Sequence, residues 1–265
     1  LGLGTAAGSF GQVVFSPLGY VLIETYGWHS ALLMFAAVSM VIIPLALALP
    51  GGNTAKGEAP SDQTLMTALR EATSHRGFVL LTIGFFVCGF HVAFITVHFP
   101  AYVTDLGLGA GVGAAGLALV GLFNIAGSVI SGLAGQRWSK KGSLSFIYTA
   151  RSLVILGLLL APKTEWTIYV FAGAMGLLWL STVPLTMGIV GQVFGLKYVA
   201  TLFGIVFLSN QWGSFLGIWL GGRLYDTTGS YDVVWWAGVA LGIAAAIVHW
   251  PIDEKPLARL SEQQA

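Results

Sequence analysis

Charged residues are scarce in this sequence. Only 9% of its 265 residues are Asp, Glu, Lys or Arg, whereas 56% are hydrophobic. Apolar runs reach the length of about 20 residues that a helix needs to cross the hydrocarbon core of a bilayer. A membrane barrel would need short segments that alternate polar and apolar residues, and no segment here alternates over its length. The composition therefore predicts an all-α integral membrane protein.

Cysteine is nearly absent, and so are signatures of catalysis. The single cysteine, Cys88, lies inside an apolar run, which excludes an internal disulfide framework and metal-ligand spacing. The sequence has no GxSxG, HExxH or phosphate-binding loop, and no acidic residue lies inside an apolar run. Its basic residues are spread over short loops and form no patch for nucleic acid. We therefore expect no metal, no cofactor, no nucleic-acid partner and no catalytic residue.

Eight apolar segments have the length of membrane spans. Tryptophans at segment ends, among them Trp28, Trp138 and Trp250, support the boundaries because indole rings prefer the headgroup level. The predicted spans are 3–23, 28–49, 78–102, 112–135, 143–161, 166–193, 199–222 and 231–250.

A ten-residue pattern occurs twice in the same register. Leu, Gly, Leu, an acidic residue, Thr and Gly of 18–27 keep their places in 220–229, and Gly11 matches Gly213 upstream. Chance matching in a glycine-rich chain is the alternative, but both copies end equivalent spans, the first and the seventh. The pattern favours a repeating unit of six helices. We expect the last two helices of one half and all six of the other, so that the missing N-terminal helices of the same protein are a partner.

The longest polar stretch separates the two parts. We assign 1–49 to the end of the N-terminal bundle, 50–77 to a linker, 78–250 to the C-terminal bundle and 251–265 to a tail. Within the linker, Leu65, Met66 and Leu69 recur at helical spacing among polar residues. This pattern predicts a short helix over 61–75 that lies on the membrane surface. Ser61 or Asp62 is placed to cap its start, and a disordered tether is the alternative.

Basic residues gather on one side of the predicted bilayer. The positive-inside rule makes that side cytoplasmic, together with the linker and both termini. The residues on this side are Lys56, Arg70, Arg76, Arg137, Lys140, Lys141, Lys197, Lys255 and Arg259, against Lys163 and Arg223 opposite.

Several side chains near the middle of the predicted spans are candidate solute ligands. Polar groups at this depth are costly and usually face a cavity or one another. Asn210 is a weaker candidate because it shares the face of Gly213 and is placed to bond a neighbouring helix. The candidates are Gln12, His91, Asn124, Arg151, Trp179 and Gln211.

The third predicted span carries a polar stripe. Gly84, His91, His98, Tyr102 and Asp105 are seven, seven, four and three residues apart, which places them on one face of a helix. This face is a candidate wall of the permeation path, and His91 or His98 is a candidate for taking up a proton near neutral pH. The alternative is a neutral histidine bonded to another helix. Both interpretations stay open for His91, and the alternative is favoured for His98.

Arg151 is the only basic residue inside a predicted span, at a cost of about 3 kcal/mol near the bilayer centre. The sequence leaves four partners open for this charge: water in a crevice, helix-end carbonyls, an acid in the missing helices, or an anionic substrate. The first three, in which Arg151 has a structural role, are favoured over the substrate.

In two further spans, the residues around Asn124 and Trp179 bear on how these two candidates are interpreted. Asn124 is the lone amide among small residues, and we favour a substrate contact over an interhelical bond. In the sixth span, Pro184 interrupts the hydrogen-bond ladder beside Trp179, Thr182 and Thr186, as in helices that move or line a ligand path.

With these motifs the chain resembles the major facilitator superfamily, specifically its bacterial monocarboxylate-porter-like transporters, over all 265 residues. The first span resembles the glycine-proline motif of the fifth helix of that superfamily, 135–141 its eight-to-nine loop and 221–231 the end of its eleventh helix. The residues that carry these motifs and the glycine stripe are Gly8, Gly11, Pro17, Gly19, Gly213, Gly217, Gly221 and Asp226.

The resemblance implies two six-helix halves around a central cavity. It favours Gln12, His91, Asn124, Trp179 and Gln211 as cavity residues over Arg151, which falls on a peripheral helix. Carriers of this group bind their anion with a basic residue in the eighth or eleventh helix, and neither matching span has one.

We expect a secondary transporter of a small organic solute, a symporter or antiporter in a bacterial plasma membrane. The sequence leaves open whether the solute is an organic anion such as a monocarboxylate and whether its transport is coupled to protons. The alternatives are a non-transporting membrane sensor or scaffold, and an intramembrane enzyme that uses His91.

Overall fold

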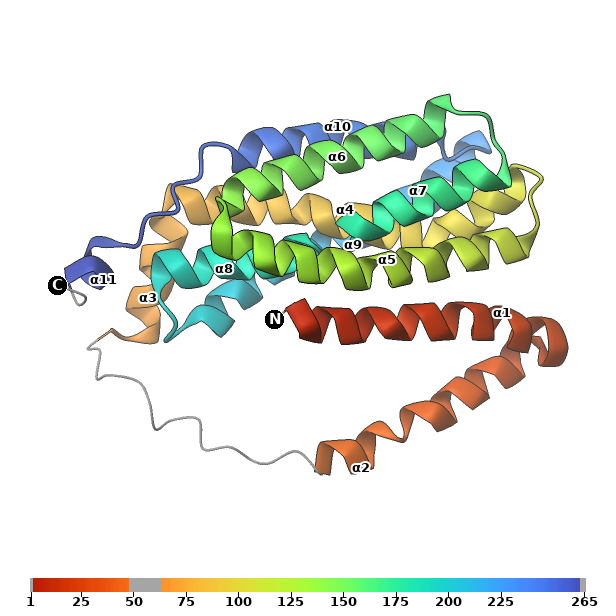
Figure 1. Ribbon diagram of the computed structural model, residues 1–265, viewed down its shortest axis with the longest axis horizontal. Coiled ribbons are helices and arrows are strands. Elements are labelled where there is room, and N and C mark those ends of the chain that lie inside the picture. The colour runs from red at the N-terminus through yellow and green to blue at the C-terminus, as the bar shows by residue number, and fades with distance from the viewer. Residues whose placement is uncertain (1, 48–62, 263–265) are drawn as a thin grey trace.

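The computed structural model describes residues 2–47 and 63–262, and every regular element among them is a helix (Figure 1). Seven helical stretches in this part of the chain are long and apolar enough to cross a bilayer. The sequence predicted eight spans. The difference lies in the stretch Phe10–Leu47, which counts once although the chain bends inside it. The all-α membrane fold is confirmed.

Glycines at equivalent positions of the repeat turn the chain at the ends of two helices. α1 (Gly2–Ser39) bends at Gly27, where φ is 77°, and Figure 1 shows the chain reversing direction there on its way to α2 (Ile42–Leu47). α9 (Val199–Thr228) ends at Gly229, where φ is 69°. Glycine adopts positive φ without steric cost, which explains why both copies of the pattern close on this residue.

The helices after the linker form one bundle. α4 packs against α9, α10 and α5, while α6 lies along α10 and α7 lies along α5. α1 also packs against α5, where the Ser16 hydroxyl donates to the carbonyl of Ala114 at 3.1 Å. The bundle consists of α4 (Arg76–Asp105), α5 (Ala110–Arg137), α6 (Lys140–Leu160), α7 (Glu165–Leu178), α8 (Thr182–Phe194), α9 and α10 (Asp232–His249).

Glycines let α9 and α4 approach closely. Gly213, Gly217 and Gly221 are buried on one side of α9 and face the backbone or side chains of α4. A Cβ at Gly217 would lie 2.6 Å from the carbonyl oxygen of Phe90, which is closer than atoms can approach. The stripe therefore works as a contact surface between helices, as small-residue stripes do in membranes.

We expect Gly217→Ala to lower the free energy of unfolding by about 1–3 kcal/mol, because the added methyl forces the two backbones apart. Gly204 of the same helix is the matched control, since nothing lies within 4 Å of its Cβ position. Gly204→Ala should be neutral or stabilise by about 0.5–1 kcal/mol. Thermal unfolding of the detergent-solubilised full-length protein measures both. Equal effects of the two substitutions would contradict this packing.

The helix expected within 61–75 is present, and its cap differs from the expected one. α3 (Leu65–Ser74) begins after Thr64, whose hydroxyl accepts from the amide of Thr67 at 3.2 Å. Ser61 and Asp62 lie outside the described residues. Glu71 of α3 forms an ion pair at 3.1 Å with Arg259 of α11 (Ala258–Glu262), so these two short helices are joined.

One end of the bundle collects the basic connections. Figure 1 places α3, α11, the α5–α6 turn and the α8–α9 turn at the left end. The α6–α7 and α9–α10 turns lie at the opposite end, with Lys163 and Arg223 near them. Lys56 lies outside the described residues. The alternating helices thus bring together the basic residues that the sequence assigned to one side.

Candidate functional site

A layer of buried polar side chains separates two apolar cores. One core contains Phe94, Phe99 and Trp235, and the other contains Phe85 and Leu144. On α6, Arg151 and Ser152 fall between Tyr148 of the second cluster and Ile155 of the first. Thr182 likewise falls between Trp179 of the first cluster and Leu185 of the second. The layer consists of His91, Asn124, Arg151, Ser152 and Thr182, and each of these side chains is at most 2% exposed. Polar groups inside a membrane bundle must find partners or they cost several kcal/mol.

The span Glu165–Phe194 is broken inside this layer. α7 ends at Leu178 and α8 begins at Thr182, and the three residues between them leave the regular helix. Pro184 explains the position, since it has no N–H to bond the carbonyl of Leu180 and its ring clashes with that carbonyl. The sequence located the interruption at Pro184 and the structure places it just before that residue. Backbone groups freed in a membrane need side-chain partners.

Arg151 supplies donors for the end of α7. Its Nε and Nη2 donate to the carbonyl of Leu178 at 3.1 and 2.6 Å, and Nη2 also donates to the carbonyl of Trp179. The guanidinium carbon lies 5.4 Å from the ring centre of Tyr148. Of the partners left open by the sequence, the structure places helix-end carbonyls against this charge. Nη1 is buried without a hydrogen bond among the described residues.

Asn124 supplies the acceptor for the start of α8. Its Oδ1 accepts from the amide of Leu180 at 2.9 Å and from the hydroxyl of Ser128 at 3.2 Å. Arg151 and Asn124 therefore act on opposite backbone groups of one break, the first on carbonyls and the second on an N–H. This geometry is that of an interhelical bond, the second interpretation of Asn124 given by the sequence.

The two histidines of the polar stripe bond backbone carbonyls. The Nε2–H of His91 donates to the carbonyl of Gly238 in α10 at 2.8 Å, and that of His98 donates to the carbonyl of Ile218 in α9 at 2.9 Å. A carbonyl only accepts, which fixes the donor in each pair. Gly84 packs against the ring of His249. The stripe thus faces α9 and α10, in agreement with the alternative of histidines bonded to other helices.

The remaining candidates do not converge on one point. Trp179 is 3% exposed and belongs to the core that contains Trp235. Gln12 is half-buried on α1, and Gln211 is exposed on α9. His91, Asn124, Arg151 and Trp179 therefore lie inside the bundle, whereas Gln12 and Gln211 lie on its flanks.

Sequence reasoning missed His249 and Tyr148. Their rings stack at 4.9 Å between centroids, His249 is fully buried, and its Nδ1–H donates to the carbonyl of Ala245 at 2.8 Å. His249 lies beside Trp250 at a span end, where a polar residue needs no explanation. No sequence signal distinguishes it from an interfacial histidine.

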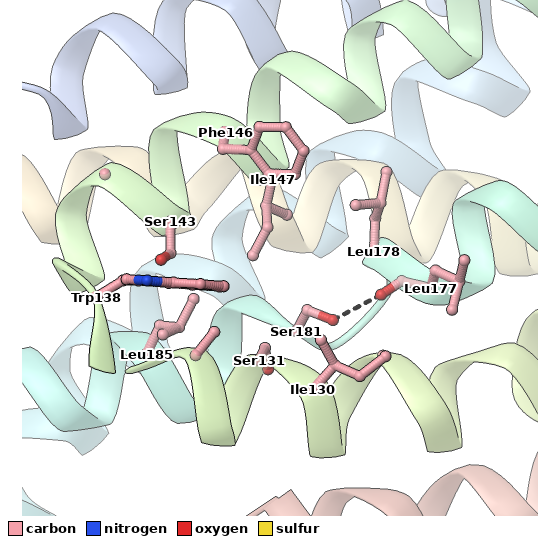
Figure 2. Close-up of a pocket in the computed structure, with 13 residues that line it drawn as sticks. Ile130, Ser131, Trp138, Ser143, Phe146, Ile147, Leu177, Leu178, Ser181 and Leu185 are labelled. Atoms are coloured by element: carbon pink, nitrogen blue, oxygen red, sulfur yellow. Dashed lines mark hydrogen bonds between the residues drawn. The ribbon is translucent and has the colours of Figure 1, made fainter. Parts of the chain in front are cut away.

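A cavity of about 510 Å³ lies beside the break (Figure 2). Ile130 and Ser131 of α5 lie on one side of it and Phe146 and Ile147 of α6 on the other. Leu178 and the other residues around the break close one end, as Figure 2 shows. The lining is apolar apart from a few hydroxyls, so the cavity suits apolar chains better than charged solutes.

Known proteins resemble this chain over nearly its whole length. It is 27% identical over 263 residues to human "Monocarboxylate transporter 11", covering 94% of this chain and 55% of that protein. It is 25% identical over 233 residues to rat "Monocarboxylate transporter 13", covering 87% and 54%. It is 25% identical over 272 residues to "Uncharacterized MFS-type transporter YcxA" of Bacillus subtilis, covering 96% and 64%. The chain spans about half the length of the monocarboxylate transporters it matches.

The family model "Major Facilitator Superfamily" matches residues 1–217. This range includes the first copy of the repeat, the broken helix, and Arg151 and Asn124, which bond the backbone at the break. Together with the helical membrane fold, the match shows that the chain belongs to the Major Facilitator Superfamily and is similar to its monocarboxylate transporters.

Proposed function

We propose that the full-length protein is a secondary active transporter that moves a small organic solute by rocking two helical bundles against each other. The observation that carries the proposal is the break near the middle of the membrane-spanning stretch Glu165–Phe194, whose freed backbone groups bond to Arg151 and Asn124. Discontinuous helices at this depth are typical of transporters. The family and the transporter names of the relatives also favour transport over enzymatic chemistry.

The solute site belongs where the two bundles meet. We assign α1 and α2 to the N-terminal bundle, and α1 lies along α5. We assign Gln12 on α1 and Gln211 on α9 as solute ligands, because both amides lie on flanks that a second bundle can cover. We assign His91, Asn124, Arg151 and Trp179 to holding the wall of the site, since three of them are bonded to backbone atoms and Trp179 packs in the core.

The substrate class we propose is a small organic anion such as a monocarboxylate, and the uptake assay below tests proton coupling. The names of the relatives support this class. A proton carried through the stripe would involve His98, which is half-buried, because His91 is fully buried and bonded to the carbonyl of Gly238. A non-transporting sensor is the second candidate, and no observation favours it over transport.

The test is uptake by the full-length protein in proteoliposomes. Radiolabelled monocarboxylates and matched neutral solutes are offered with and without an inward proton gradient. We expect saturable uptake of at least one carboxylate above protein-free vesicles, and His91→Gln to leave its pH profile intact because His91 bonds Gly238. Binding of a solute without any uptake would favour the sensor.

We also propose that the end of the bundle with α3 and α11 faces the cytoplasm of a bacterial cell, because the basic connections gather there. Cysteines introduced at Arg70 and at Thr164 report the two ends, and the native Cys88 is buried. An impermeant thiol reagent added outside intact cells should label the Thr164 site and spare the Arg70 site. The opposite pattern would reverse the orientation.

A further inference from the structure

Two grooves flank the beginning of α6. The first is the 510 Å³ cavity between α5 and α6, and the second is a cavity of about 780 Å³ between α6 and α10. Both are lined by Gly142 and Phe146 of α6, so these two residues form the ridge that separates them. We call them the α5–α6 groove and the α6–α10 groove.

Both grooves open toward the surroundings of the bundle. Phe146 on the ridge is 69% exposed, and Trp138 at the mouth of the α5–α6 groove is 70% exposed. Trp250 lines the α6–α10 groove and is 71% exposed. Since this is a membrane protein, large apolar side chains exposed here face the lipid, and the two indole rings mark the headgroup level.

Positive charge gathers where the grooves meet. Arg137, Lys140 and Lys141 lie within five residues at the α5–α6 turn, next to Trp138 and Gly142. Lys140 donates to the side chain of Gln192 at 2.7 Å. Arg137 is exposed and Lys141 is half-buried, so both ammonium and guanidinium groups can reach a ligand at the membrane surface.

A carboxylate also lies at this turn. Glu254 accepts from the backbone amide of Lys141 at 2.5 Å and so occupies the N-terminus of α6. An anionic ligand must therefore bind the side chains of Arg137 and Lys141 instead of the helix N-terminus. Three cations against this one bonded carboxylate leave the turn positive.

We infer that an anionic diacyl phospholipid of the bilayer binds across α6, with one chain in each groove and its phosphate at Arg137 and Lys141. Two apolar grooves that share a ridge match two chains joined at one headgroup. Basic residues at the cytoplasmic ends of such grooves are typical of anionic lipid sites. The chain in the α5–α6 groove would contact Leu178 and Ser181, on both sides of the helix break. This inference is independent of which solute is transported.

The positive charge of Arg137 and Lys141 favours an anionic lipid over other molecules that could fill the grooves. A zwitterionic lipid or a detergent molecule would fill the grooves equally well but gains little from Arg137 and Lys141. Each basic residue near the surface favours an anionic lipid, and two of them together predict a preference of about tenfold or more.

Native mass spectrometry of the purified full-length protein tests the site. The protein is equilibrated with equal amounts of phosphatidylglycerol and phosphatidylethanolamine in detergent. We expect one retained phosphatidylglycerol, about tenfold enriched over phosphatidylethanolamine. Arg137→Gln with Lys141→Gln should abolish the enrichment. The matched control is Arg70→Gln with Arg76→Gln, which removes two exposed cations at the same end and should preserve it.

A second variant tests the groove itself. Ala134→Phe fills the α5–α6 groove and leaves every charge in place, so it should reduce retention of phosphatidylglycerol. Unfolding temperatures show that the variants remain folded. Equal retention of both lipids by the unaltered protein, or enrichment that survives Arg137→Gln with Lys141→Gln, overturns the inference. Unchanged retention in folded Ala134→Phe does so too.

Discussion

Replacing Arg151 with leucine should destabilise the protein strongly and abolish uptake. Arg151 makes three hydrogen bonds to the carbonyls of Leu178 and Trp179. Hydrogen bonds from a charged donor are worth about 1.5–3 kcal/mol each, whereas removing the charge recovers about 3 kcal/mol of insertion cost. The net loss in the free energy of unfolding is then about 2–6 kcal/mol.

Two further substitutions sharpen this prediction. Arg151→Lys keeps the charge but lacks the planar fork that reaches two carbonyls, so its stability and uptake should fall between those of the unaltered protein and Arg151→Leu. Arg223→Leu removes an exposed arginine at the end of α9 and should change stability by less than about 0.5 kcal/mol. Thermal unfolding and uptake are measured on all three. An Arg151→Leu protein as stable as the unaltered one would show that the hydrogen bonds from Arg151 are not needed to hold the helix break.

Helices and their order follow from the sequence because their signals are local. Apolar length predicted the spans, and the repeat predicted that two equivalent spans end near Gly27 and Gly229, where the chain turns. Pro184 predicted a disturbed helix for the same reason, since the missing N–H and the ring clash act within one turn. The linker helix was also predicted, although its cap at Thr64 was not.

The partners of the buried polar residues do not follow from the sequence. His91 bonds a carbonyl 147 residues away, and Asn124 bonds an amide 56 residues away. Every residue has a carbonyl, so no side-chain pattern marks Gly238 or Leu178 as acceptors. The position of a polar residue near the middle of a predicted span indicates that it needs a hydrogen-bond partner. Which atom is that partner depends on how the helices pack, and this is seen only in the structure.

Rocking of the two bundles should stop when α1 is tied to α5. The ring of Tyr20 on α1 lies 3.9 Å from the Cβ position of Gly111 on α5, so Tyr20→Cys with Gly111→Cys can be joined by a short bifunctional thiol reagent. Cys88 is buried and should not react. The matched control joins α5 to α7 inside one bundle through Phe123→Cys with Gly173→Cys, where the corresponding distance is 3.4 Å.

The most direct measurement is therefore solute uptake by these two cross-linked proteins in proteoliposomes, before and after the linker is cleaved. Two bundles that move as rigid bodies predict that the α1–α5 link abolishes uptake, that cleavage restores it, and that the α5–α7 link has little effect. Uptake that continues at the same rate with α1 tied to α5 would contradict alternating access by bundle rocking.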